Sequence, residues 1–210
     1  IRARDLEVSV GHLTTRAKHH FLIRALPLIF RVGDPPIPMT RLGTGYGGWW
    51  VPDFSLKPGS NAYCAGAGED ISFDLALHAR GVAVTCFDPT PRAVEYVRTH
   101  DPGPPFSFHA FGWWDSDGSI EFYEPKNPQH VSYSITNIQE TSEYFMAEVK
   151  TVRSTMEMLG DAHVNMIKMD IEGAERRVVV QMFQDDVKPE ALLVELDGSR
   201  SLPSAREFVR

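Results

Sequence analysis

The chain has 210 residues, of which 42% are hydrophobic and 23% charged, with a formal net charge of -7. These values are typical of one globular domain and do not favour intrinsic disorder. The acidic balance disfavours a nucleic-acid partner, because phosphate binding depends on clustered lysine and arginine. The apolar stretch FLIRALPLIF is interrupted by Arg24 and Pro27 and is too short to span a bilayer. With no secretory signal evident, we expect no membrane partner.

Residues 1–60 differ in character from the rest of the chain. Residues 11–30 have a helical pattern, and residues 32–54 form a loop-rich stretch that contains five glycines and the adjacent pair Trp49 and Trp50. Glycines this dense disfavour regular structure unless the backbone must approach another group closely. We therefore expect an N-terminal cap over residues 1–60, packed on a domain formed by residues 61–210.

From residue 61 onward, short apolar runs alternate with amphipathic segments. The pattern predicts core strands over 61–66, 82–88, 105–113, 164–170 and 190–198, and helices over 70–81, 91–100 and 173–184. A turn at Asp117-Gly118 should lead into a short antiparallel strand. This order predicts an α/β fold with a mostly parallel sheet and helices on both faces. We expect binding residues at the carboxyl ends of the strands, and further strands of such a sheet beyond residue 210.

The helix over 70–81 has a predicted buried face. In the helix over 70–81, the expected inward residues are Phe73, Leu75, Leu77 and Ala79, with Gly81 ending the helix. The loop over 124–137 has an irregular composition and is a candidate lid. Its His130 is a candidate catalytic base, although most exposed loop histidines are only solvated.

The glycine loop GAGED, residues 66–70, has several interpretations. A dinucleotide site would require a third glycine where the chain has Ile71, and Glu69 and Asp70 would repel a pyrophosphate. A P-loop is excluded because no Gly-Lys-Ser/Thr follows. A cationic ligand suits the loop better. The alternative is a purely structural turn with Asp70 as the helix N-cap.

The second core strand ends in CFDPTP, which places Asp88 at its carboxyl end. A carboxylate at this position can accept two hydrogen bonds from a ribose diol, as in nucleotide-binding sheets. Alternatively, Asp88 caps the helix that follows.

Cys64 and Cys86 each lie in a strand-like run, which predicts buried free thiols and not a disulfide framework. Two cysteines in this setting fit a reducing compartment. We therefore expect a cytoplasmic protein.

Four motifs occur in a characteristic order: YCAGAGED, VTCFDPTP, HAFGWWDSDGSIEFY and MIKMDIEGAE. Together they resemble the FkbM-type class I methyltransferases, over about residues 41–197, and MIKMDIEGAE is the most specific of them. The resemblance implies a Rossmann-like sheet and S-adenosylmethionine as cofactor. Many members carry an acid in the first strand, where this chain has Tyr63-Cys64-Ala65. We expect Glu69 or Asp70 to make the contacts that this acid makes in those members.

The resemblance also implies roles for individual residues. The residues assigned to the cofactor's amino-acid tail and ribose are Ala65, Gly66, Gly68, Asp70, Asp88 and Pro89, and those assigned to the adenine wall are Phe111, Gly112 and Trp113. Trp113 could equally be a core residue. Asp170 is expected near the methyl group, and the candidate bases are Asp170, Glu172 and His130. Arg41 and residues 46–50 are expected to line the cofactor or acceptor pocket, with a structural cap as the alternative.

The leading hypothesis is an S-adenosylmethionine-dependent methyltransferase that acts on a hydroxyl group of a small molecule. The alternatives are an NAD(P)-dependent oxidoreductase and a non-catalytic binding protein with the same fold. Asp170 with Glu195 or Asp197 could supply oxygen ligands to a divalent cation. The resemblance does not require a metal, and we predict none. Glu175 is expected to be a helix-start carboxylate.

Overall fold

A computed structural model of the chain describes residues 37–124, 133, 135 and 141–195, all of which belong to the compact unit Ile37–Asp197. The expected helix within residues 11–30, His130 with most of the candidate lid, and Asp197 lie outside the described residues.

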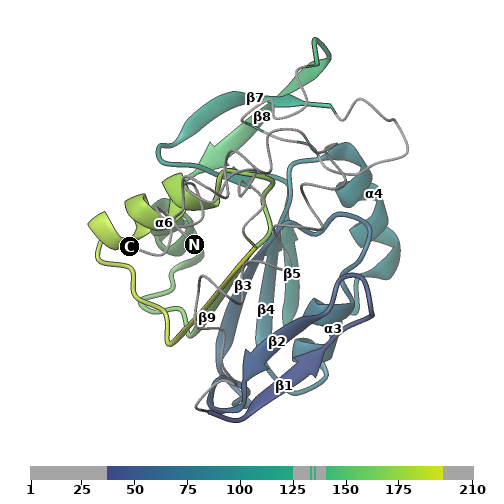
Figure 1. Cartoon of the computed structure of the whole chain (residues 1–210), viewed down its shortest axis with the longest axis vertical. Coiled ribbons are helices and arrows are strands. Elements are labelled where there is room, and N and C mark those ends of the chain that lie inside the picture. Colours follow the sequence, from purple (N-terminus) through teal and green to yellow (C-terminus); the bar gives the residue numbers. More distant parts are fainter. Residues whose placement is uncertain (1–36, 125–132, 134, 136–140, 196–210) are drawn as a thin grey trace, which may run out of the picture. The chain divides into compact units, whose positions relative to one another are not determined.

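A five-stranded parallel sheet forms the centre of this unit (Figure 1). Its strands are β3 (Asn61–Ala65), β4 (Ala83–Phe87), β5 (Phe106–His109), β9 (Met166–Met169) and β10 (Ala191–Val194), in the spatial order β10-β9-β3-β4-β5. From β3 the chain builds the sheet outward through β4 and β5, then returns to the other side of β3 with β9. Such a reversal of strand order opens a crevice at the carboxyl ends of the strands. The predicted α/β fold is confirmed.

Helices cover both faces of the sheet and create two hydrophobic cores. Helices α3 (Ser72–His78) and α4 (Pro91–His100) pack on one face, and α5 (Val152–Leu159) and α6 (Glu175–Gln184) pack on the other. Successive residues of a strand therefore point into opposite cores: Cys64 lies in the core on the α3 and α4 face, and Tyr63 lies in the core on the α5 and α6 face. All four residues of β9 are buried, as expected for a strand covered on both faces.

Helix α3 departs from the expected burial pattern. Phe73 and Leu77 are buried as predicted, and Gly81 adopts φ +80° beyond the helix end. However, Leu75 is only partly buried, and Ala79 is exposed at the C-cap position that follows His78. The third buried residue of the helix is Asp74, whose side chain sequence patterning would assign to solvent.

The glycine-rich stretch before β3 is more regular than predicted. Strands β1 (Met39–Leu42) and β2 (Trp49–Pro52) form an antiparallel hairpin, followed by the 3-10 turn η1 (Asp53–Ser55). The glycines cluster in the turn between the two strands, so they do not interrupt the pairing. Leu42 and Val51 join the core on the α3 face of the sheet.

A second, three-stranded sheet has the order β6-β8-β7, with β6 (Gly112–Trp113), β7 (Gly118–Tyr123) and β8 (Tyr144–Lys150). The predicted turn at Asp117-Gly118 leads into β7, which pairs antiparallel with β8. Sequence patterning did not identify β8 or α5. Figure 1 shows β7 and β8 lying together at one end of the parallel sheet.

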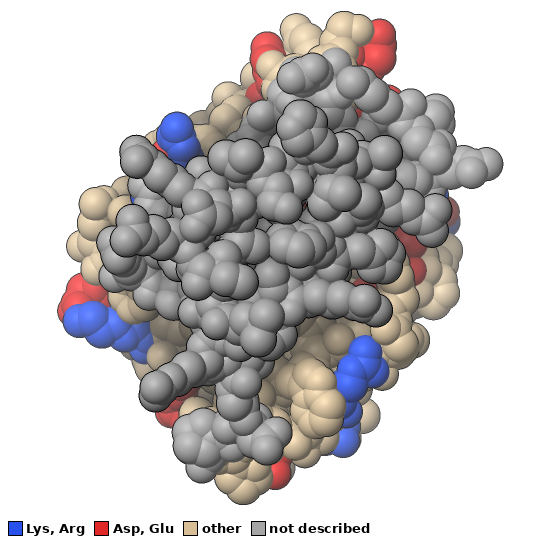
Figure 2. Space-filling model, viewed as in Figure 1, with Lys and Arg blue, Asp and Glu red and all other residues tan. Residues whose placement is uncertain are grey.

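On the face seen in Figure 2, lysine and arginine side chains of the described residues lie in several separate places. None of the helices in the described part of the chain is long and apolar enough to span a bilayer.

Candidate functional site

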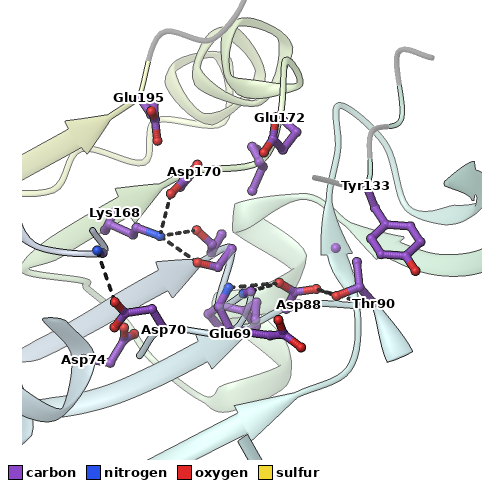
Figure 3. Close-up of a pocket in the computed structure, with 18 of the residues that line it drawn as sticks. Glu69, Asp70, Asp74, Asp88, Thr90, Tyr133, Lys168, Asp170, Glu172 and Glu195 are labelled. Atoms are coloured by element: carbon purple, nitrogen blue, oxygen red, sulfur yellow. Dashed lines mark hydrogen bonds and ion pairs between the residues drawn. The ribbon is translucent and has the colours of Figure 1, made fainter. Parts of the chain in front are cut away.

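A cavity of about 450 Å³ lies at the carboxyl ends of β3, β4 and β9 (Figure 3). Its lining includes the hairpin turn, the glycine loop, the segment after β4 and the segment after β9, namely residues 46–49, 65–70, 87–90 and 170–172. Phe122, Tyr133 and Ile135 contribute apolar surface. The size is in the range of small-molecule sites, and the position is the one expected for the fold.

The glycine loop runs in direct contact with the end of β9. Gly66 has φ +86°, and a Cβ atom at this position would lie 1.8 Å from the backbone oxygen of Asp170. The amide of Asp170 donates to the carbonyl of Ala65 at 3.1 Å, which keeps the two segments together. Glycine is therefore required at position 66 for both backbone conformation and close approach.

The carboxylate of Asp88 accepts hydrogen bonds from neighbouring groups of the chain. Its Oδ2 accepts hydrogen bonds from the amides of Ala67 (2.9 Å) and Gly68 (3.0 Å). Its Oδ1 accepts from the amide (2.8 Å) and hydroxyl (2.6 Å) of Thr90. A carboxylate offers about four acceptor positions, and all four are used in this arrangement. The geometry thus supports a structural role for Asp88 in fixing the loop, and a ribose hydroxyl would have to share these oxygens.

Lys168 is a site residue that sequence reasoning missed. It lies within β9 and is only 4% exposed, yet its Nζ reaches the cavity wall. It donates to the carbonyls of Gly66 (2.7 Å) and Ala65 (3.3 Å) and lies 3.6 Å from Asp170 Oδ2. It also lies 5.3 Å from the ring centroid of Trp49. A lysine inside the otherwise apolar run MIKM was the available signal.

Asp74 is the second missed residue, and it lies on the face of the sheet that carries Lys168. The strand register pairs Cys64 with both Cys86 and Lys168, which places these three side chains in one row beneath α3. Asp74 is 3% exposed, and its buried Oδ1 accepts no hydrogen bond from the described residues. Burial raises the pKa of Asp74, while the charge of Lys168 and the two thiols oppose part of this rise.

The charge of Lys168 is maintained by its acidic neighbours. Burial by itself would lower the pKa of the ammonium group, but the charges of Asp170 and Asp74 outweigh it and raise this pKa. Lys168 is therefore a cation at neutral pH, held between two carboxylates.

Asp70 ties the hairpin to helix α3. Its carboxylate accepts hydrogen bonds from Thr44 Oγ1 (2.5 Å), Gly47 N (3.2 Å) and Ser72 N (2.9 Å). Burial opposes ionisation, but these hydrogen bonds outweigh it and lower the pKa of Asp70. The N-cap of α3 is Ile71, so Asp70 is not the N-cap that the structural alternative predicted; its bond from Ser72 N fixes the turn that precedes the helix, and its side chain also lines the cavity.

Most of the expected site residues come together at the cavity. Those that line it are Ala65, Gly66, Gly68, Asp70, Asp88, Pro89, Gly112, Trp113, Asp170 and Glu172. Trp113 is also a core residue, being 1% exposed, and its Nε1 donates to Thr155 Oγ1 at 3.2 Å. His130 lies outside the described residues.

Three expected residues are placed elsewhere. Trp50, the last residue of the expected run 46–50, is exposed and does not line the cavity. The ring of Phe111 does not line the cavity and packs against Phe87, with centroids 5.3 Å apart, in the core on the α6 face. Arg41 is exposed and is not among the cavity-lining residues. It donates instead to the carbonyls of Gly45 (3.3 Å) and Gly48 (3.4 Å) and thereby holds the hairpin turn.

The ends of β9 and β10 supply further acids. Figure 3 shows Asp170, Glu172 and Glu195 at the same end of the view. Glu175 serves as the expected helix-start carboxylate, since its Oε1 accepts from the amides of Ile171 (3.0 Å) and Gly173 (3.2 Å). No group of three or more His, Cys, Asp or Glu side chains is arranged to hold a metal ion in the described ranges.

The cavity has a strongly acidic lining. Among the described residues, Lys168 is its one lysine or arginine, and the acidic residues are Glu69, Asp70, Asp74, Asp88, Asp170, Glu172 and Glu195. Such a lining favours a ligand that carries positive charge and disfavours a pyrophosphate.

Comparison with protein families gives one match: residues 51–205 fit the family model described as a methyltransferase FkbM domain. No curated protein and no solved structure matches the chain.

Proposed function

Because the chain belongs to the FkbM methyltransferase family, we propose that it uses S-adenosylmethionine to methylate a hydroxyl oxygen of a small molecule. The observation that carries this proposal is the acidic cavity at the carboxyl ends of β3, β4 and β9. S-adenosylmethionine bears a sulfonium and an ammonium group, so its positive charges complement this lining. The family match does not favour the oxidoreductase alternative.

The residues of the cavity fit the parts of this cofactor. The glycine loop, residues 65–70, would hold the amino-acid tail, because its glycines permit close backbone approach. Residues 87–90 would contact the ribose, and Gly112 with Trp113 would border the adenine. Asp170 would lie nearest the transferable methyl group.

The cofactor supplies an electrophilic methyl group on a positively charged sulfur. The protein has to align the acceptor oxygen for in-line displacement and exclude water, and Trp49, Phe122 and Tyr133 offer apolar surface for this. A hydroxyl acceptor must also lose its proton. Asp170 is the best placed of the described candidate bases, because it lies 31% exposed at the cavity, where the methyl group is expected. Glu172 and His130 remain the other candidates.

The proposal predicts selective stabilisation by S-adenosylhomocysteine, the demethylated cofactor. At about 100 times its Kd, a ligand specific for the folded state adds about 2.7 kcal/mol of stability. For a domain of this size, that corresponds to a rise in Tm of about 5–10 °C. Thermal unfolding with S-adenosylhomocysteine and with NAD, in parallel, measures it.

The two other outcomes of this measurement would favour the alternative functions. Stabilisation by NAD alone would overturn the proposal in favour of an oxidoreductase. Stabilisation by neither ligand would support the non-catalytic binding protein.

A further inference from the structure

The turn between β1 and β2 presents an exposed aromatic ring at the cavity. Tyr46 lines the cavity and is 85% exposed, whereas Trp50 of the same hairpin is exposed but does not line the cavity. A ring on the wall of a site loses contact with water when a ligand packs on it, and this burial favours binding. Tyr46 is therefore placed to contact a ligand of the cavity.

The backbone of the turn holds Tyr46 in a fixed position. Thr44 Oγ1 accepts hydrogen bonds from the amides of Tyr46 (3.2 Å) and Gly47 (3.0 Å), and it donates to Asp70 Oδ2 (2.5 Å). The amide of Thr44 donates to Ser72 Oγ on α3 at 2.8 Å. A contact residue on a turn that is already ordered costs less entropy on binding than one on a loop that must first become ordered.

The two glycines that follow Tyr46 are required by the turn itself. A Cβ atom at Gly47 would lie 2.6 Å from Asp70 Cγ, and one at Gly48 would lie 2.3 Å from the carbonyl oxygen of Thr44. Tyr46 and Trp49 consequently supply the side-chain surface that residues 46–49 contribute to the cavity. We call these two rings the aromatic platform.

The aromatic platform leads from solvent toward the expected position of the methyl group. Trp49 is partly buried, and its ring centroid lies 5.3 Å from Lys168 Nζ. The same Nζ lies 3.6 Å from Asp170 Oδ2 (Figure 3). Trp49 therefore forms the inner end of the platform, near Asp170, and the exposed Tyr46 forms its outer end.

The cofactor contacts proposed above leave the aromatic platform unassigned. They lie in residues 65–70 and 87–90 and at Gly112 with Trp113, so the platform is free for the methyl acceptor. Aromatic rings pack favourably on other rings. The acidic lining of the same cavity disfavours an acceptor that carries negative charge.

We propose that the acceptor is a ring-bearing hydroxy compound without negative charge, and that Tyr46 and Trp49 pack against its ring. This inference rests on the proposed function and adds the acceptor class and two specificity-determining residues. In the transfer step, the acceptor oxygen bonds to the methyl carbon while the carbon–sulfur bond breaks and its electron pair stays on sulfur. The hydroxyl proton passes to the base, for which Asp170 is the described candidate nearest the platform.

Titration of three small alcohols into the complex of the protein with S-adenosylhomocysteine, followed by nuclear magnetic resonance, tests this acceptor class. The probes are benzyl alcohol, 1-hexanol and the anion 4-(hydroxymethyl)benzoate. We expect benzyl alcohol to bind at least about threefold more tightly than either of the others, since an aromatic pair adds to the burial of apolar surface. A purely apolar wall would favour 1-hexanol instead.

Variants of the outer ring test the contact itself. Tyr46→Ala should weaken benzyl alcohol about 3- to 10-fold, the usual effect of losing an aromatic pair, and should leave the affinity for S-adenosylhomocysteine within about twofold. Tyr46→Phe keeps the ring and should retain the binding of benzyl alcohol. Trp50→Ala is the matched control, because it removes an exposed ring of the same hairpin that lies outside the cavity lining.

The other outcomes separate the parts of the proposal. No binding of benzyl alcohol to the complex, or binding no tighter than that of 1-hexanol, would overturn the ring-bearing acceptor. Tighter binding of the benzoate would overturn the charge preference. If Tyr46→Ala behaves like Trp50→Ala, Tyr46 does not contact the acceptor. Failure of wild type to bind S-adenosylhomocysteine would overturn the proposed function itself.

Discussion

Replacing Lys168 with methionine is expected to lower the free energy of unfolding by about 3–5 kcal/mol, the usual cost of removing one partner from a buried ion pair. The substitution leaves the carboxylate of Asp74 buried without its neighbouring cation. It also removes the donor from the carbonyls of Ala65 and Gly66 at the start of the glycine loop. Urea denaturation of both proteins measures the difference.

A double variant identifies the cause of this loss. In Lys168→Met/Asp74→Leu the uncompensated charge is gone, so we expect it to recover most of the lost stability, because apolar replacement of a buried ion pair is often neutral. It should not recover binding of S-adenosylhomocysteine. A loss below about 1 kcal/mol in the single variant, or no recovery in the double variant, would contradict the electrostatic account of this cluster.

The second large effect is expected for Asp88→Ala. This change removes four hydrogen bonds and leaves the amides of Ala67, Gly68 and Thr90 without their acceptor. Hydrogen bonds to a charged group contribute about 1.5–3 kcal/mol each, and partial replacement by water reduces the sum. We expect a loss of about 3 kcal/mol in the free energy of unfolding. Because the glycine loop loses its anchor, affinity for S-adenosylhomocysteine should fall at least tenfold.

Asp101→Ala is the matched control for this prediction. Asp101 also accepts a hydrogen bond from an amide two residues later, that of Gly103 at 2.8 Å, but it lies in an exposed loop away from the cavity. Its replacement should change stability by less than about 0.5 kcal/mol. If Asp88→Ala behaves like Asp101→Ala in stability but loses cofactor binding, Asp88 contacts the ribose directly and the loop-fixing role is wrong.

Much of the fold could be predicted from the sequence because it rests on local patterns. The resemblance to FkbM-type methyltransferases is confirmed, as is the parallel sheet with helices on both faces. Strands such as β10 are continuous apolar runs, and Gly81 marks the end of a helix through a backbone conformation that favours glycine. These signals need no knowledge of distant contacts.

The buried charges could not be predicted in the same way. Asp74 lies on an amphipathic helix, where a charged residue is normally assigned to solvent. Its burial depends on the register that places Lys168 beside Cys64, residues more than a hundred positions apart in the chain. Likewise, the roles of Asp88 in fixing the loop and of Arg41 in holding the hairpin turn depend on which backbone groups lie within reach. Sequence spacing identified Asp88 as a candidate, but the acceptors and donors around it are set by the tertiary structure.

The most direct test of the central claim is a crystal structure of the protein with S-adenosylhomocysteine. The account predicts the nucleoside in the cavity at the carboxyl ends of β3, β4 and β9, with its sulfur beside Asp170 and its ribose over residues 87–90. Ligand bound at another surface, with this cavity holding only solvent, would contradict it.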